Sequence, residues 1–191
     1  MTGASRQPDE EIVRNWGVSD HLDNIDCVGK PRLTLAELTL LFQHDDLVGH
    51  PAITTVLNNA AWALNECLWA ARSDLADINL CLSAIEGFFQ VIATHPKRCP
   101  TGLLYMFWDI ACGRGECGDE AVEENPVCHR LLMTLSSILG LESRECQMSA
   151  LHGLNHMPSR ATSQIIHRHY RALINNEVRG YAGEALRGQA L

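Results

Sequence analysis

The chain has 191 residues, a formal net charge of −8 and a hydrophobic content of 46%. These values exclude an intrinsically disordered chain and indicate a single domain, 1–191, that can bury a sizeable core. The acidic balance argues against a nucleic-acid partner, because phosphate binding depends on Lys and Arg, and against binding to an anionic membrane surface.

The start of the chain and the placement of its cysteines bear on its location. Residues 1–11 lack the apolar region that secretion requires, and no stretch reaches the about 18 uninterrupted apolar residues of a membrane span. We therefore expect a cytoplasmic protein.

Of the eight cysteines, Cys67, Cys81 and Cys146 lie within apolar helical patterns, where a reduced thiol behaves as a small hydrophobic side chain. Because disulfide frameworks are typical of secreted chains, we expect reduced, mostly buried thiols.

Apolar residues at helical spacing recur along the whole chain, and no convincing strand pattern stands between them. Thr34 and Glu37 form a capping-box pattern before one helix, and Pro96 ends another because the residue before proline disfavours helical geometry. The apolar residues of the predicted helices lie within 10–16, 35–42, 53–69, 78–92, 103–111, 126–139, 143–157, 159–173 and 178–186, and the helix around 78–92 is expected to begin at Ser73 or Asp74 and to stop at His95. Their expected first or capping residues include Thr34, Pro51, Thr101, Pro126, Ser143 or Glu142, and Ser159 or Thr162.

We expect one all-α domain of about seven to nine helices. Residues 1–30 are polar and mixed, and we expect an irregular N-terminal segment there apart from the short helix at 10–16. Three glycines within six residues, at 113–118, give the strongest loop signal in the chain. We expect residues 113–125 to form a flexible loop.

The stretch Ala-Leu-His-Gly-Leu-Asn-His at 150–156, the apolar residues that begin with Ile165 and Ile166, and the segment 179–188 form a pattern of paired helices. Together, residues 142–188 resemble a HEAT-like repeat. The resemblance implies an α-α superhelix of stacked antiparallel helix pairs, each of which buries its face against the next pair. It also implies a scaffold with an extended surface for a protein partner, although such folds serve several functions.

His152 and His156 are the first candidate site. They lie four residues apart on one predicted helix, so both face the same way, and this spacing can hold a metal ion with imidazole ligands. The Glu of a His-Glu-x-x-His protease motif is missing, because Gly153 follows His152. His167 and His169 point apart, so at most one of them could join. The alternative is that these histidines line a seam between helices and form local hydrogen bonds.

Cysteines around the glycine-rich loop are the second candidate site. Cys112, Cys117 and Cys128, with His129, could complete a tetrahedral zinc site, although the four-residue gap is long and two adjacent ligands on one helix have poor geometry. A redox switch between Cys112 and Cys117 is a second possibility, and an ordinary flexible loop is the third.

The chain has no phosphate-binding loop, dinucleotide fingerprint or nucleophile elbow. We therefore predict a soluble helical-repeat scaffold or adaptor that mediates protein–protein interaction, and an interaction protein rather than an enzyme. The alternative is a metal-binding module or metal-dependent enzyme, with zinc as the one cofactor in view. A homo-oligomer is also possible, since one terminal helix at 178–186 is polar enough to cap a stack and the other end is less clearly polar.

Overall fold

All regular structure in the described part of the chain is helical. The structure, a computed structural model, describes residues 33–44, 47–51, 53–70, 73–96, 102–112, 117–118 and 124–188. These ranges hold eight α-helices and one 3-10 turn: α2 (Leu35–Phe42), α3 (Ile53–Leu68), α4 (Leu75–Thr94), α5 (Leu103–Ala111), α7 (Pro126–Leu139), α8 (Arg144–Asn155), α9 (Arg160–His169), η3 (Tyr170–Ala172) and α10 (Asn176–Ala185). The predicted all-α fold is confirmed. The helix expected at 10–16, the rest of 1–32 and most of the loop at 113–125 lie outside the described residues.

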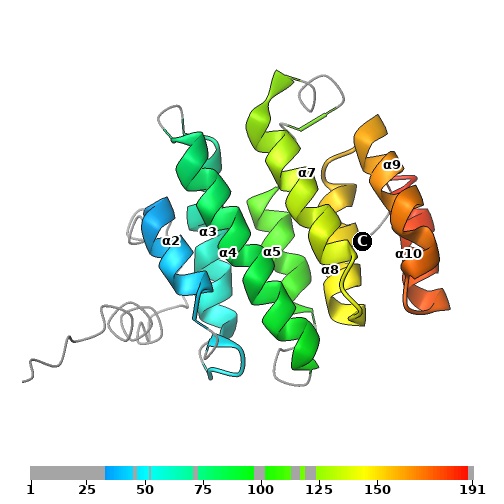
Figure 1. Ribbon diagram of the computed structural model, residues 1–191, viewed down its shortest axis with the longest axis horizontal. Helices are drawn as coiled ribbons and strands as arrows, with labels where there is room; N and C mark the ends of the chain where they lie inside the picture. The colour runs from blue at the N-terminus through cyan, green and yellow to red at the C-terminus, as the bar shows by residue number, and fades with distance from the viewer. Residues whose placement is uncertain are drawn as a thin grey trace, which may run out of the picture.

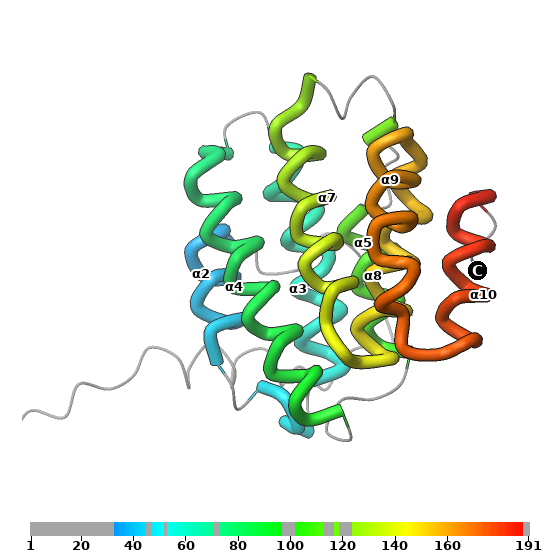
Figure 2. Tube along the Cα trace, turned by 45° about the vertical axis from the view of Figure 1, so that its right-hand side comes forward, coloured from blue at the N-terminus to red at the C-terminus, as the bar shows by residue number. Residues whose placement is uncertain are grey.

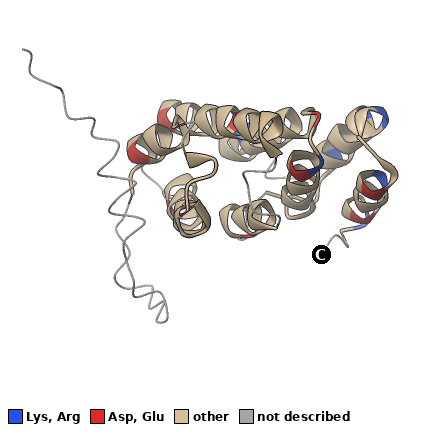
Figure 3. Ribbon diagram, turned by 90° about the horizontal axis from the view of Figure 1, so that it is seen from below, with Lys and Arg blue, Asp and Glu red and all other residues tan. Residues whose placement is uncertain are grey.

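The helices pack in two layers (Figure 1). One layer holds α2, α4, α7 and α9 in that order, and the other holds α3, α5, α8 and α10, each helix in contact with the next in its layer. The contacts of α2 with α3 and of α7 with α8 join the layers, which Figure 3 shows from below. Chain order therefore runs from one end of the slab to the other (Figure 2). Packing between neighbouring helix pairs is the arrangement of a helical-repeat-like fold.

Local capping explains where several helices begin. The Thr34–Glu37 capping box is confirmed: the Glu37 N–H donates to Thr34 Oγ1 over 3.3 Å, and the Thr34 N–H donates to Glu37 Oε2 over 2.8 Å. Asn125, Ser143, Ser159 and Asn175 accept similar bonds at the starts of α7, α8, α9 and α10. The prediction of Thr101 as a cap is wrong. Gly102 occupies that position with a φ of 91°, a left-handed conformation that glycine adopts without strain.

Among the described helices, α4 alone is long and apolar enough, by length and composition, to cross a membrane. It packs against α2, α7 and α8, and its buried residues include Ile78, Leu82, Ile85, Phe89 and Ile92. An apolar composition is what a helix needs when neighbours cover it in this way. The buried apolar face of α4 is therefore accounted for by its place in the slab.

A disulfide bond joins Cys117 to Cys128 at the start of α7. The expectation of reduced thiols is wrong for these two residues. It holds for Cys67, Cys81, Cys112 and Cys146, which form no disulfide bond, whereas Cys27 and Cys99 lie outside the described residues. The two Cα atoms lie 5.4 Å apart, within the range that a disulfide spans.

Candidate metal centre

One face of α8 lies against α5. Ser149, His152, Gly153 and His156 follow the i, i+3, i+4, i+7 spacing that places side chains on one side of a helix. The Ser149 hydroxyl donates to the Leu104 carbonyl oxygen over 2.8 Å and so ties the first turn of this face to α5. The two histidines follow one and two turns later on the same face, so both are held opposite α5.

Gly153 allows the close approach of these helices. A Cβ atom at this position would lie 2.7 Å from Leu135 Cδ2 and 3.1 Å from Trp108 Cγ, both closer than side chains normally pack. Trp108 is fully buried and stands directly before Asp109 on α5. A glutamate at position 153, which the protease motif would require, has no space here. Gly153 therefore has two effects: it excludes the His-Glu-x-x-His motif, and it lets Asp109 come within reach of the histidines.

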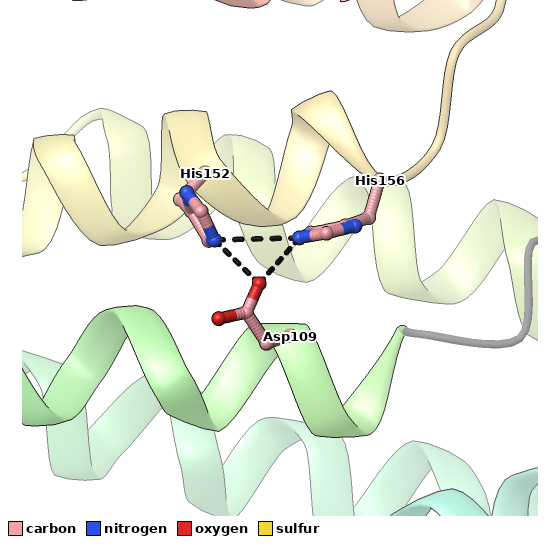
Figure 4. Close-up of side chains that lie close together, drawn as sticks. All are labelled: Asp109, His152 and His156. Atoms are coloured by element: carbon pink, nitrogen blue, oxygen red, sulfur yellow. Dashed lines mark hydrogen bonds and ion pairs between the residues drawn. The ribbon is translucent and has the colours of Figure 1, made fainter. Parts of the chain in front are cut away.

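Asp109 completes a three-residue cluster with the histidines (Figure 4). Its Oδ1 atom lies 2.6 Å from His152 Nε2 and 2.6 Å from His156 Nε2, and the two Nε2 atoms are 3.3 Å apart. The His152 side chain is 7% exposed, whereas those of His156 and Asp109 are 30% and 31% exposed. His152 is thus buried, and the cluster is open to solvent on the side of His156 and Asp109.

The carboxyl group of Asp109 is ionised at neutral pH. Partial burial raises its pKa, but hydrogen bonds and charge from His152 and then His156 outweigh this, so the net pKa lies below its usual value. An ionised carboxylate accepts hydrogen bonds and donates none. Both Nε2 atoms therefore carry a proton when they bond to Asp109.

Tyr181 of α10 contacts the opposite side of the His152 ring. Its hydroxyl oxygen lies 2.6 Å from His152 Nδ1, and the ring of Tyr105 packs edge-on against both residues. Burial, followed by the neighbouring Tyr105 and Asp109, raises the pKa of the Tyr181 hydroxyl above its ordinary value. The hydroxyl therefore stays protonated. This Tyr–His–Asp chain lacks the lowered pKa that would activate Tyr181 as a nucleophile.

The donor set suits a transition-metal ion. Asp109, His152 and His156 each offer one ligand atom, and these atoms lie within 4.8 Å of one another. With metal–ligand bonds of about 2.0–2.2 Å, tetrahedral ligands stand about 3.3 Å apart. The two imidazole nitrogens already have this separation. The carboxylate oxygen needs to withdraw by only about 0.7 Å from each nitrogen to reach it.

The structure brings together two of the five residues predicted as metal ligands, His152 and His156. It does not assemble the cysteine site: Cys117 and Cys128 are bonded to each other and offer no thiolate. Cys112 is a free thiol whose burial raises its pKa to about 12, so it stays protonated, and the disulfide pairs Cys117 with Cys128 instead of with Cys112.

The other histidines considered from the sequence also lie outside the cluster. His129 is exposed on α7. His169 bonds to the hydroxyl of Ser136, and His167 Nδ1 bonds to the Ser163 carbonyl oxygen. Neither of the α9 histidines therefore joins His152 and His156.

Sequence reasoning missed Asp109, which lies 43 residues before His152. A search for a carboxylate near the histidines in the chain could not find it, since its approach depends on α5 and α8 being neighbours in the second layer. One feature of the sequence could have indicated Asp109: it is the sole charged residue within the apolar helix α5. A lone carboxylate in such a helix needs a partner when it is partly buried.

Comparison of the chain with protein-family models, with curated proteins and with solved structures finds no match. The functional assignment therefore depends on the contacts of the site itself.

Proposed function

We propose that this protein binds a divalent transition-metal ion, with zinc as the best fit, between α5 and α8. The observation that carries the proposal is the convergence of Asp109 Oδ1, His152 Nε2 and His156 Nε2 from two helices. Two histidines and one carboxylate form a ligand set that proteins use for zinc, with a fourth position left for water or another ligand. Partial exposure of Asp109 and His156 gives that position access to solvent.

The chemistry of the donors favours zinc over the hard cations. Imidazole nitrogens suit Zn²⁺, Cu²⁺, Ni²⁺ and Fe²⁺, whereas Ca²⁺ and Mg²⁺ prefer shells of oxygen ligands. Two of the three donors here are imidazoles. The buried His152 also has a hydrogen-bond partner on its second nitrogen, as metal-bound histidines almost always do.

Metal titration of the tag-free protein tests the proposal. After chelation and dialysis, we expect calorimetry with Zn²⁺ at neutral pH to show one ion bound per chain. Titration with Co²⁺ should give the visible absorption bands of a four- or five-coordinate ion with nitrogen ligands. If Zn²⁺ gives no saturable heat and Co²⁺ keeps the spectrum of the hydrated ion, the site does not bind metal.

A second candidate function, a protein-binding scaffold, draws on the outer surface of α2, α4 and α7. Leu40, Leu80 and Met133 are 40%, 61% and 45% exposed there, one on each helix. Glu37 and Asp77 stand one helical turn before Leu40 and Leu80, so acidic groups flank the exposed leucines. In the described part of the chain every Lys or Arg lies at position 130 or later (Figure 3). The partner that fits is an amphipathic segment with apolar anchors and basic flanks.

Charge placed on this surface tests the scaffold function. A partner recovered with the wild-type protein should be lost with the Leu80→Asp variant, because an exposed apolar anchor becomes an anion. The matched control is Met106→Asp, which alters a residue 53% exposed on α5 in the other layer. If no partner with basic flanks is recovered, or if Leu80→Asp retains it as the wild type does, this surface is not the binding site.

A further inference from the structure

His152 is held from both sides by residues of two other helices. Nε2 faces Asp109 of α5 and Nδ1 faces the Tyr181 hydroxyl of α10, each at 2.6 Å. We infer that Tyr181 is the outer-sphere positioning residue of the metal centre. In this role it accepts the Nδ1–H of His152 when Nε2 binds the ion. The inference rests on the metal site proposed above and adds a third helix to it.

The direction of the hydrogen bond follows from the proton on the ring. A neutral imidazole carries one N–H proton. Without metal that proton lies on Nε2 and is donated to Asp109, so Nδ1 accepts the O–H of Tyr181. A metal ion takes the lone pair of Nε2, so the single proton then lies on Nδ1 and is donated to the Tyr181 oxygen. The hydroxyl proton of Tyr181 then turns away from the ring.

Packing holds the Tyr181 hydroxyl in position. The residue is 8% exposed, and its ring packs 6.1 Å from that of Tyr105. A hydrogen bond also joins α10 to α8: Arg144 Nε donates to Glu177 Oε2 over 2.8 Å. The hydroxyl is therefore held in place by contacts that do not involve the histidine. A partner that is already in position loses little freedom when the metal binds.

A linkage follows between the metal and the last helix. If the Tyr181 contact strengthens metal binding, the bound metal must strengthen the contact of α10 with α8 by the same free energy. Tyr181 lies in the middle of α10 on its buried face. Metal binding would thus strengthen the attachment of α10, at the C-terminal end of the slab, through the His152 ring.

The Tyr181→Phe variant tests the inference, with Tyr105→Phe as the matched control. Both remove one hydroxyl from a ring next to His152, but the hydroxyl at 181 is the one bonded to Nδ1. We expect Tyr181→Phe to weaken Zn²⁺ binding about 10- to 100-fold, as loss of an outer-sphere partner does, and Tyr105→Phe to change it less than about threefold. Equal affinities of wild type and Tyr181→Phe would overturn the inference while leaving the metal site intact. A wild type that binds no Zn²⁺ would instead refute the metal site itself.

Nitrogen-15 NMR of the histidine rings gives a second readout, which reports the position of the ring proton and not the affinity for the metal. In the wild-type protein, addition of Zn²⁺ should move the His152 proton from Nε2 to Nδ1 and protect the Nδ1 proton from exchange with water. In Tyr181→Phe that protection should be lost. An Nδ1 proton that exchanges as fast in the wild type as in the variant would show that Tyr181 does not accept it.

Discussion

We expect the His156→Ala variant to bind Zn²⁺ at least about 100-fold more weakly than the wild type. It removes one of three ligands, and loss of an outer-sphere partner alone costs about 10- to 100-fold. The Asp109–His152 pair remains, because His152 is held independently by Tyr181. The change should leave the fold intact, since His156 is partly exposed at the last turn of α8. Calorimetry and the Co²⁺ spectrum measure the effect, and far-ultraviolet circular dichroism reports the helix content.

His167→Ala is the matched control for this prediction. It removes a histidine from the neighbouring helix α9, where the side chain is exposed and bonds to the Ser163 carbonyl oxygen. We expect its Zn²⁺ affinity to equal that of the wild type. Should the two variants lose affinity to the same degree, the chain binds zinc through dispersed surface histidines and not through the cluster.

We expect Gly153→Ala to destabilise the protein by about 1–3 kcal/mol, the usual cost of overpacking a core. The added methyl group would press on Leu135 of α7 and on Trp108 of α5, so the Leu135 side chain would have to move and α5 and α8 would have to separate by a few tenths of an ångström. Because the α5–α8 contact sets the distance from Asp109 to the histidines, the Zn²⁺ affinity should fall as well. Chemical denaturation and calorimetry on the same preparations measure the two effects.

Gly180→Ala is the opposite case and serves as the control. Gly180 lies within α10, and a Cβ atom there would meet no other atom within 4 Å. Alanine stabilises an open helical position by about 0.5–1 kcal/mol relative to glycine. We therefore expect the two glycine substitutions to shift the free energy of unfolding in opposite directions. A stability gain in both variants would mean that α5 and α8 are not as close as the structure has them.

The positions of the helices could be predicted from the sequence because their signals are local. Thr34 and Glu37 cap α2 through contacts three residues apart, and Pro126 opens α7 next to its capping Asn125. Of the two starts predicted for each of the next helices, Ser143 caps α8 and Ser159 caps α9. The exception, at Thr101, shows the limit of this reasoning: Gly102 occupies the cap position of α5 in a left-handed conformation and forms no side-chain cap bond.

The candidate site could be predicted only in part, because its other half depends on tertiary packing. The spacing of His152 and His156 on one helix face is a local property, and the structure keeps it. Asp109 and Tyr181 come from helices that meet α8 only after the layers form. The disulfide between Cys117 and Cys128 was missed for the same reason, since the spacing of two cysteines along the chain does not show that their Cα atoms lie 5.4 Å apart.

The two-layer order of the helices has a consequence for unfolding. Each helix touches mainly its neighbours along the layer, so the slab behaves as a short row of units whose cooperativity depends on the strength of each interface. An ion shared by α5 and α8 would join these two helices at the middle of this row. Loading the ion would then make the two ends melt as a single unit, where otherwise they could come apart separately.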